Sequence, residues 1–140
     1  QLHRRQRQMC IRDSSSPMLL KSQVELLKSL TQQHKTQTDA VNTNMDKVTH
    51  LIKSKELVAA LDCLIDVRSK NTYIREVNLQ IIECLTQAWP SNFRAREVKI
   101  LLKSCFKVCR ELYNEKELET LNVLRNFELA ESRVAKHALD

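Results

Sequence analysis

The chain has 140 residues, with 23 Lys+Arg, 17 Asp+Glu, five cysteines, two prolines and no glycine. A chain without glycine excludes the phosphate-binding loops G-x-G-x-x-G and G-x-x-x-x-G-K and the nucleophile elbow G-x-S-x-G, because these turns need residues that lack a Cβ. The length suits one domain with a core of its own, and the formal net charge of +6 favours a polyanionic partner.

The N-terminal residues account for half of this charge. Residues 4–13 read RRQRQMCIRD, which resembles the in-frame translation of a transposase adapter used in sequencing libraries. We therefore expect residues 1–13 to be a disordered, adapter-derived segment, and residues 14–140 to form a single helical domain truncated at its own N-terminus. A genuine basic arm that binds nucleic acid or membrane is the alternative. Residues 1–13 hold four arginines and one aspartate, or +3, so the other 19 Lys+Arg and 16 Asp+Glu also leave +3.

A long first helix is expected from Pro17 onward. The serines before it supply an N-cap, and proline at the first helical position loses no hydrogen bond. Ten residues then follow one another at alternating spacings of four and three, which places them on one face of a helix, called the seam below. The residues in the middle of this seam, Thr31, His34 and Thr38, are polar, so we expect the helix to bend, to break or to face water there. The seam consists of Leu20, Val24, Leu27, Thr31, His34, Thr38, Val41, Met45, Val48 and Ile52.

Two shorter helices are expected next. The run from Lys55 to Arg68 has apolar residues at helical spacing and predicts the second helix. Asn71 or Thr72 can cap the third helix. Its apolar stripe consists of Ile74, Val77, Ile81, Leu85 and Ala88.

The dipeptide Trp89-Pro90 is the clearest break in the chain, because the residue before a proline is pushed out of the α region. Ser91 or Asn92 can cap a fourth helix over residues 93–113.

The last part of the chain completes the fold class. Asn114 and Glu117 form a capping-box-like start for a fifth helix, and no segment shows the period-two alternation of a strand. The sequence therefore predicts an all-α fold, an antiparallel helical array of about five helices that is armadillo-like.

The cysteines do not form the paired knuckles of a zinc site, because the only close pair lies within an expected helix and has no second pair to match it. Cys105 and Cys109 stand four apart on one expected helix, and Cys63 and Cys84 lie on others. Zinc sites usually carry close C-x2-4-C pairs on a knuckle, whereas a buried reduced cysteine behaves as a small hydrophobe, which is the role we favour. No acid/base dyad or Cys–His nucleophile stands out. We expect no enzymatic activity, no metal and no cofactor.

The fourth expected helix has a basic face and an apolar face. At about 100° per residue, five cations fall within an arc of about 80° opposite a row of apolar residues. This pattern predicts a docking surface for a polyanion such as an acidic protein tail, nucleic acid or anionic lipid, with a solvated face as the alternative. Phe93 and Phe106 provide no evident exposed stacking platform, which weakens single-stranded nucleic-acid binding. These five cations, called the basic stripe below, are Arg96, Lys99, Lys103, Lys107 and Arg110.

Tyr73 and Trp89 stand out in a chain with 4% aromatic residues. Tyrosine and tryptophan dominate the hot spots of protein interfaces, so both residues are candidate interface anchors. Packing in the core or against a helix turn is the alternative.

Residues 34–89 contain a His-x-Thr opening at His34, an acidic-apolar helix start, a Val/Ile-rich helix and Trp89. This pattern resembles the C-terminal helical domain of the katanin regulatory subunit, the non-catalytic WD-repeat subunit in microtubule severing. Its His-x-Thr opening matches His34 and Thr36, and its tryptophan just over fifty residues later matches Trp89. Between them, the acidic-apolar helix start matches the segment 56–65, ELVAALDCLI, and the Val/Ile-rich helix matches the segment 73–77, YIREV.

The resemblance implies a non-catalytic interaction module. Such a domain pairs with the N-terminal helical domain of an AAA ATPase severing subunit, and the pair engages microtubules and spindle-pole or ciliary proteins in the cytoplasm and cytoskeleton. The basic stripe would then suit contact with acidic tubulin tails.

Two other functions fit the same residues. A generic helical-repeat adaptor or scaffold would bind another protein through Tyr73, Trp89 and a groove. A basic helical domain that binds nucleic acid through the stripe is a less favoured alternative.

Overall fold

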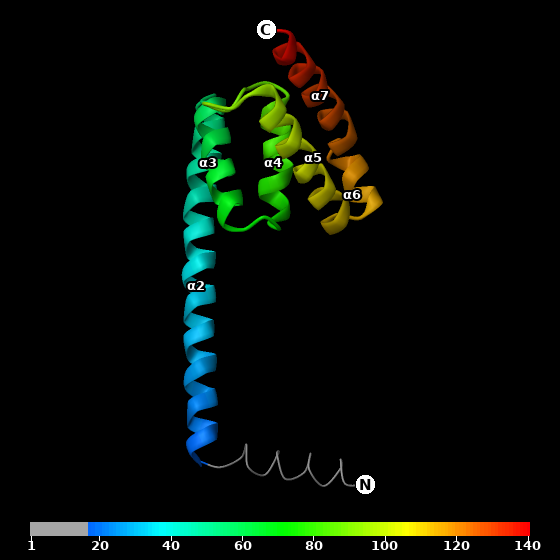
Figure 1. Cartoon of the computed structure of the whole chain (residues 1–140). Helices are drawn as coiled ribbons and strands as arrows, with labels where there is room; N and C mark the ends of the chain where they lie inside the picture. Colours follow the sequence, from blue (N-terminus) through cyan, green and yellow to red (C-terminus); the bar gives the residue numbers. More distant parts are fainter. Residues whose placement is uncertain (1–16) are drawn as a thin grey trace. The chain divides into compact units, whose positions relative to one another are not determined.

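The computed structural model describes the backbone of residues 17–140 and the side chains from Leu20 onward, so the expected adapter segment 1–13 lies outside the described residues. Within residues 17–140 the chain forms six helices and no strand, which confirms the all-α helical array (Figure 1). The helices are α2 (Pro17–Lys53), α3 (Leu57–Lys70), α4 (Arg75–Leu85), α5 (Ala95–Leu112), α6 (Glu115–Thr120) and α7 (Val123–Leu139).

The chain divides into two compact units, Gln1–Ala40 and Val41–Asp140. The described part of the first unit is helix, and every side chain from residue 20 to residue 40 is exposed. The polar middle of the predicted seam therefore faces water, and α2 continues through it without a break. The hydroxyls of Thr31 and Thr38 donate to the carbonyls of Leu27 (2.8 Å) and His34 (2.9 Å), so they are satisfied inside the helix.

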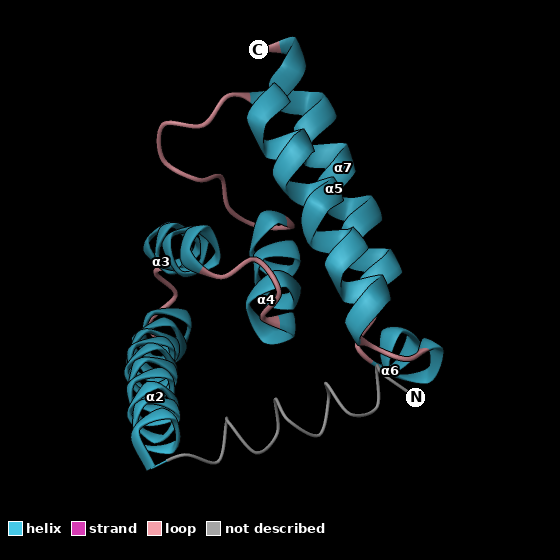
Figure 2. Ribbon diagram, turned by 60° about the horizontal axis from the view of Figure 1, so that its bottom comes forward, coloured by secondary structure: helices cyan, strands magenta, loops and turns pink. Residues whose placement is uncertain are grey.

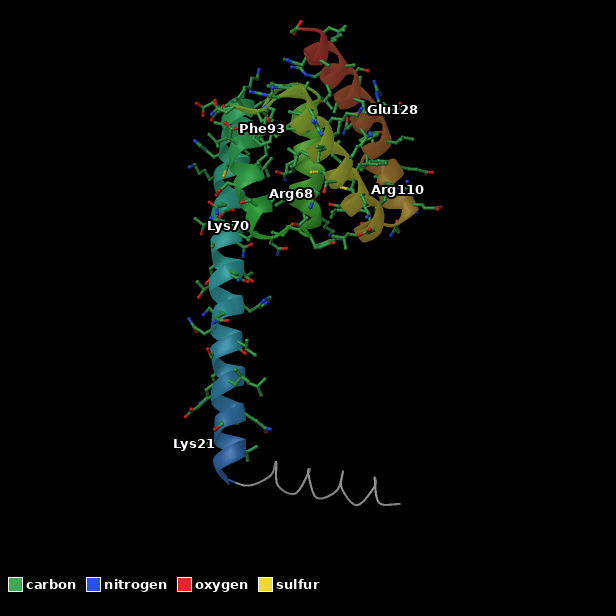
Figure 3. The ribbon with its side chains drawn as sticks, in the orientation of Figure 1. Lys21, Arg68, Lys70, Phe93, Arg110 and Glu128 are labelled. Atoms are coloured by element: carbon green, nitrogen blue, oxygen red, sulfur yellow. The ribbon has the colours of Figure 1, made fainter. Side chains whose placement is uncertain are left out.

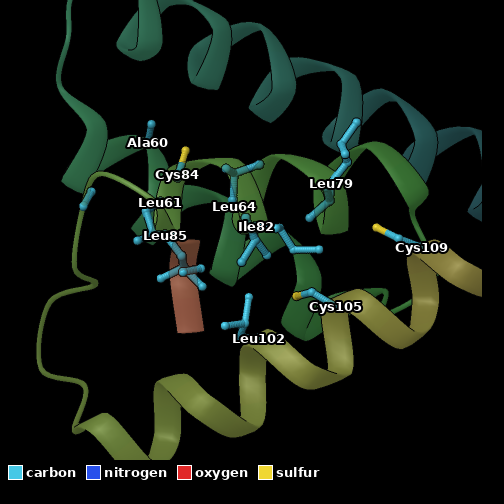
Figure 4. Packing of buried hydrophobic residues seen from close by; sticks show 14 of the residues in the cluster. Ala60, Leu61, Leu64, Leu79, Ile82, Cys84, Leu85, Leu102, Cys105 and Cys109 are labelled. Carbon is cyan, nitrogen blue, oxygen red and sulfur yellow. The ribbon is translucent and has the colours of Figure 1, made fainter. Parts of the chain in front are cut away.

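The second unit is built around α4. This helix packs against α3, α5 and α7, and seven of its eleven residues are buried. Figure 4 shows Leu64, Ile82 and Leu102 meeting in the core, one from each of α3, α4 and α5. The residues from α2 that join this core are Val41, Met45, Val48, Leu51 and Ile52.

A polar network crosses this apolar core. The guanidinium of Arg68 on α3 (Arg68 is labelled in Figure 3) donates through Nε to Oδ1 of the fully buried Asn78 on α4 (2.7 Å), and through a second nitrogen to the hydroxyl of Ser104 on α5. The Asn78 amide donates in turn to the carbonyls of Thr72 (2.8 Å) and Ile74 (2.7 Å). The side-chain polar groups of Asn78 are thereby paired, as buried polar groups must be.

The turn before α5 differs from its prediction. The helix is capped by Arg94, whose N–H donates to the Glu97 carboxylate (3.3 Å), and neither Ser91 nor Asn92 is the cap. The N–H of Ser91 instead donates to the Asp62 carboxylate on α3 (3.0 Å). Asn92 is left-handed, with φ of 62°, whereas an N-cap residue needs the β region.

The start of the third predicted helix also differs, whereas the start of the fifth is as predicted. Asn71 accepts a hydrogen bond from the N–H of Tyr73 (3.2 Å) in a local turn, and α4 begins only at Arg75. The predicted capping box of α6 is confirmed, because the N–H of Glu117 donates to Asn114 Oδ1 (2.8 Å) and the N–H of Asn114 to Glu117 Oε1 (3.3 Å).

The fifth predicted helix is in fact two helices. The left-handed residue Asn122, with φ of 54°, ends α6 and redirects the chain into α7. The turn lets α7 run back beside α5 in the opposite direction (Figures 1 and 2).

The substitution Asn78→Ala tests the polar network. It leaves the Arg68 Nε without its acceptor and the Thr72 carbonyl without its donor, so we expect the free energy of unfolding to fall by about 2–3 kcal/mol. Urea denaturation followed by circular dichroism measures this change. The control is Asn71→Ala at an exposed position. If this variant lost as much free energy of unfolding as Asn78→Ala, burial of the network would not explain the effect.

Candidate polyanion-binding groove

The basic stripe lies along one face of α5, as the sequence predicts. All five of its cations are exposed. The opposite face supplies core residues, because α5 packs there against α4 and α7. These buried residues are Val98, Leu102, Cys105, Val108 and Cys109.

Four of the five stripe cations line a groove between α5 and α7. The groove consists of two adjoining hollows that share Lys103, with volumes of about 460 Å³ and 260 Å³. Arg96 lies outside it. From Lys99 to Arg110 the groove follows eleven helical steps, or about 17 Å. Its lining, called the α5–α7 groove below, consists of Lys99, Leu102, Lys103, Phe106, Lys107, Arg110 and Glu111 from α5 and of Phe127, Glu131, Val134, Ala135 and Ala138 from α7.

Two phenylalanine rings line the larger hollow. Phe106 and Phe127 stack with ring centroids 4.2 Å apart and planes 20° apart. The guanidinium carbon of Arg110 lies 5.8 Å from the Phe106 centroid, within cation–π distance. Sequence reasoning missed Phe127, because it comes from α7 and only the packing of the two helices brings it beside Phe106. Both rings are half-buried, and each stacks on the other.

The cations of the groove are not neutralised within the fold. Among residues 17–140, none of the stripe cations takes part in an ion pair. The groove lining holds four basic residues and two acidic ones, Glu111 and Glu131, which leaves a net charge of +2. Like charges on one helix face repel one another, so an anion that enters the groove relieves this repulsion.

The cysteines belong to the core. Cys84, Cys105 and Cys109 are buried and reduced, and Cys63 is half-buried. Burial raises the pKa of Cys84 to about 11 and the pKa of Cys105 and of Cys109 to about 12. These thiols therefore stay protonated at neutral pH. Within the described range, no three His, Cys, Asp or Glu side chains cluster as metal ligands would.

The two predicted interface anchors lie outside the groove. Tyr73 stands just before α4 with 64% of its surface exposed. Trp89 is half-buried: its indole N–H donates to the carbonyl of Phe93 (3.0 Å), and its ring stacks on His137 of α7 with centroids 3.7 Å apart. Trp89 thus holds the turn before α5 against the end of α7, and Tyr73 is the freer of the two to contact a partner.

Comparisons with protein-family models, with characterised proteins and with solved structures gave no match to this chain. None of the helices in the described residues is long and apolar enough to cross a bilayer.

Alkylation of the thiols tests their burial. A thiol pKa raised from 9.0 to about 12 lowers the thiolate fraction at pH 8 roughly 1,000-fold. In a Cys10→Ser variant treated with iodoacetamide at pH 8, we expect Cys63 to react first and Cys84, Cys105 and Cys109 to react only after urea is added. Peptide mass spectrometry assigns each site, and early modification of Cys105 or Cys109 would contradict their burial.

Proposed function

We propose that this chain contains a non-catalytic helical interaction module of a microtubule-severing complex, which pairs with the AAA ATPase subunit and holds acidic tubulin tails in the α5–α7 groove. The observation that carries the proposal is the alignment of four cations, unpaired among the described residues, along one groove. The resemblance of residues 34–89 to the katanin regulatory subunit supports the choice of complex. The expected location is the cytoplasm and the microtubule cytoskeleton, at the centrosome or spindle pole.

The size of the groove favours an extended polypeptide. About 17 Å of helix matches roughly five residues of extended chain at about 3.3 Å each. Carboxylates on such a segment would pair with Lys99, Lys103, Lys107 and Arg110. An apolar or aromatic side chain of the same segment would rest on Phe106 and Phe127. Because the charges lie at the rim, they would mainly steer the acidic segment and speed its association.

Nucleic acid is a second candidate, which the Phe106–Phe127 pair favours. A base could rest on these rings while the backbone phosphates meet the lysines. We rank it below acidic polypeptide because the ring faces already stack on each other and Arg110 covers one of them.

Charge reversal tests the groove directly. We expect Lys103→Glu/Lys107→Glu to weaken cosedimentation with microtubules at least about tenfold, because two attractions become repulsions. Microtubules whose acidic tails have been removed by subtilisin should bind the unaltered chain as weakly as intact microtubules bind the variant. Each measurement is made with and without an AAA partner.

The control is Lys47→Glu/Lys53→Glu on α2, which changes the net charge equally at two exposed lysines outside the groove. Equal losses for both variants would indicate a general charge effect. No pelleting under any condition would leave the adaptor alternative and reject microtubule binding. Binding to single-stranded RNA that falls steeply with salt and disappears in Lys103→Glu/Lys107→Glu would support the second candidate instead.

A further inference from the structure

The first unit presents a helix face without cover among the described residues. Every side chain from residue 20 to residue 40 is exposed. A helix in a protein gains most of its stability from packing, and clustered exposed apolar residues mark interaction sites. The large apolar residues there are 42–63% exposed and are Leu20, Val24, Leu26, Leu27 and Leu30.

Four of the seam positions in this unit follow a coiled-coil pattern. Their alternating spacings of four and three form a heptad repeat, with Leu20 and Leu27 at d and with Val24 and Thr31 at a. His34 takes the next d position, and Thr38 continues the a positions. In a parallel coiled coil, β-branched residues at a combined with leucine at d favour two strands.

The threonines at a positions suit burial against another helix. The hydroxyls of Thr31 and Thr38 already donate to carbonyls of α2 itself, at 2.8 Å and 2.9 Å. A partner helix that covered them would therefore leave no hydroxyl donor unpaired. Their methyl groups remain available for packing.

A column of lysines flanks the seam and indicates what kind of helix fits. Lys21, Lys28 and Lys35 occupy successive e positions, and all three are exposed (Lys21 is labelled in Figure 3). In a parallel pair, each e position faces a g position of the other strand, where charged residues form interhelical salt bridges. The lysines would therefore pair best with carboxylates at the g positions of the other strand.

A second copy of this chain does not supply them. Its own g positions are Gln23, Leu30 and Gln37, so a parallel self-pair would set the lysines against glutamine and leucine. An antiparallel self-pair would set lysine against lysine, which is repulsive. Charge complementarity thus favours a different chain.

We propose that residues 20–38 of α2 form one strand of a parallel, two-stranded coiled coil with an amphipathic helix of a partner protein that carries carboxylates at its g positions. This inference does not depend on the α5–α7 groove or on tubulin binding, because it concerns other residues and another ligand.

Two synthetic peptides of about four heptads serve as probes. Both have valine at a and leucine at d, and they differ only in glutamate or lysine at every g position. In fluorescence anisotropy with the full chain, we expect the glutamate peptide to bind about tenfold more tightly than the lysine peptide, because several weak pairs turn from attraction to repulsion. The difference should shrink at high salt.

Two matched pairs of variants locate the contact. Lys21→Gln/Lys28→Gln/Lys35→Gln should abolish the preference for the glutamate peptide. Ser22→Glu/Ser29→Glu/Thr36→Glu, with the same change in net charge on the opposite helix face, should keep that preference.

The second pair compares neighbouring leucines of similar exposure, Leu27 at 63% and Leu26 at 60%. Leu27→Ala, on the seam, should weaken binding about tenfold, and Leu26→Ala, beside it, should change binding much less. Because both side chains are exposed, neither substitution should unfold the chain, which circular dichroism checks. Equal affinity for the two peptides, no binding of either, or self-association that Leu27→Ala abolishes would each overturn the proposal.

Discussion

The second unit depends on how one guanidinium is satisfied inside an apolar core. Arg68 donates hydrogen bonds to Asn78 on α4 and to Ser104 on α5. The Asn78 amide in turn donates to the carbonyls of Thr72 and Ile74. A part-buried cation that lost these acceptors would cost far more than an exposed one. The two hydrogen bonds of Arg68 join α3 to α4 and to α5, so the network favours the observed packing of these three helices.

This position decides which side of α5 is free. With Ser104 bonded to Arg68 and with Leu102 and Cys105 in the core, Lys103 and Lys107 face away from α4 and line the groove beside α7. The charge of Arg68 also acts on the core thiols: it opposes, without overcoming, the effect of burial that raises the pKa of Cys105 and of Cys109. The polar network thus helps to orient the candidate site. Burial, not the network, keeps the thiols protonated.

What the sequence by itself determined is local. The helical content follows from apolar spacing, and the two faces of α5 follow from the order of its residues, so the basic stripe could be predicted before any packing was known. The capping box of Asn114 and Glu117 was also predicted correctly, because its donors and acceptors lie three residues apart. The continuity of α2 does not belong here: the sequence left a bend, a break or a water-facing stretch open, and the structure has one helix whose threonines bond within it.

What only the tertiary structure decided depends on residues distant in the sequence. Ser91 does not cap α5, which begins only after Arg94; its N–H donates instead to Asp62, 29 residues earlier in the chain. The groove needs Phe127 to meet Phe106, and this requires the turn at Asn122 that splits the last predicted helix and brings α7 back along α5. A periodic pattern identifies which face of a helix is buried or charged, but it carries no information about which other helix lies beside that face. The stripe was therefore predictable, whereas the groove that makes it a candidate site was not.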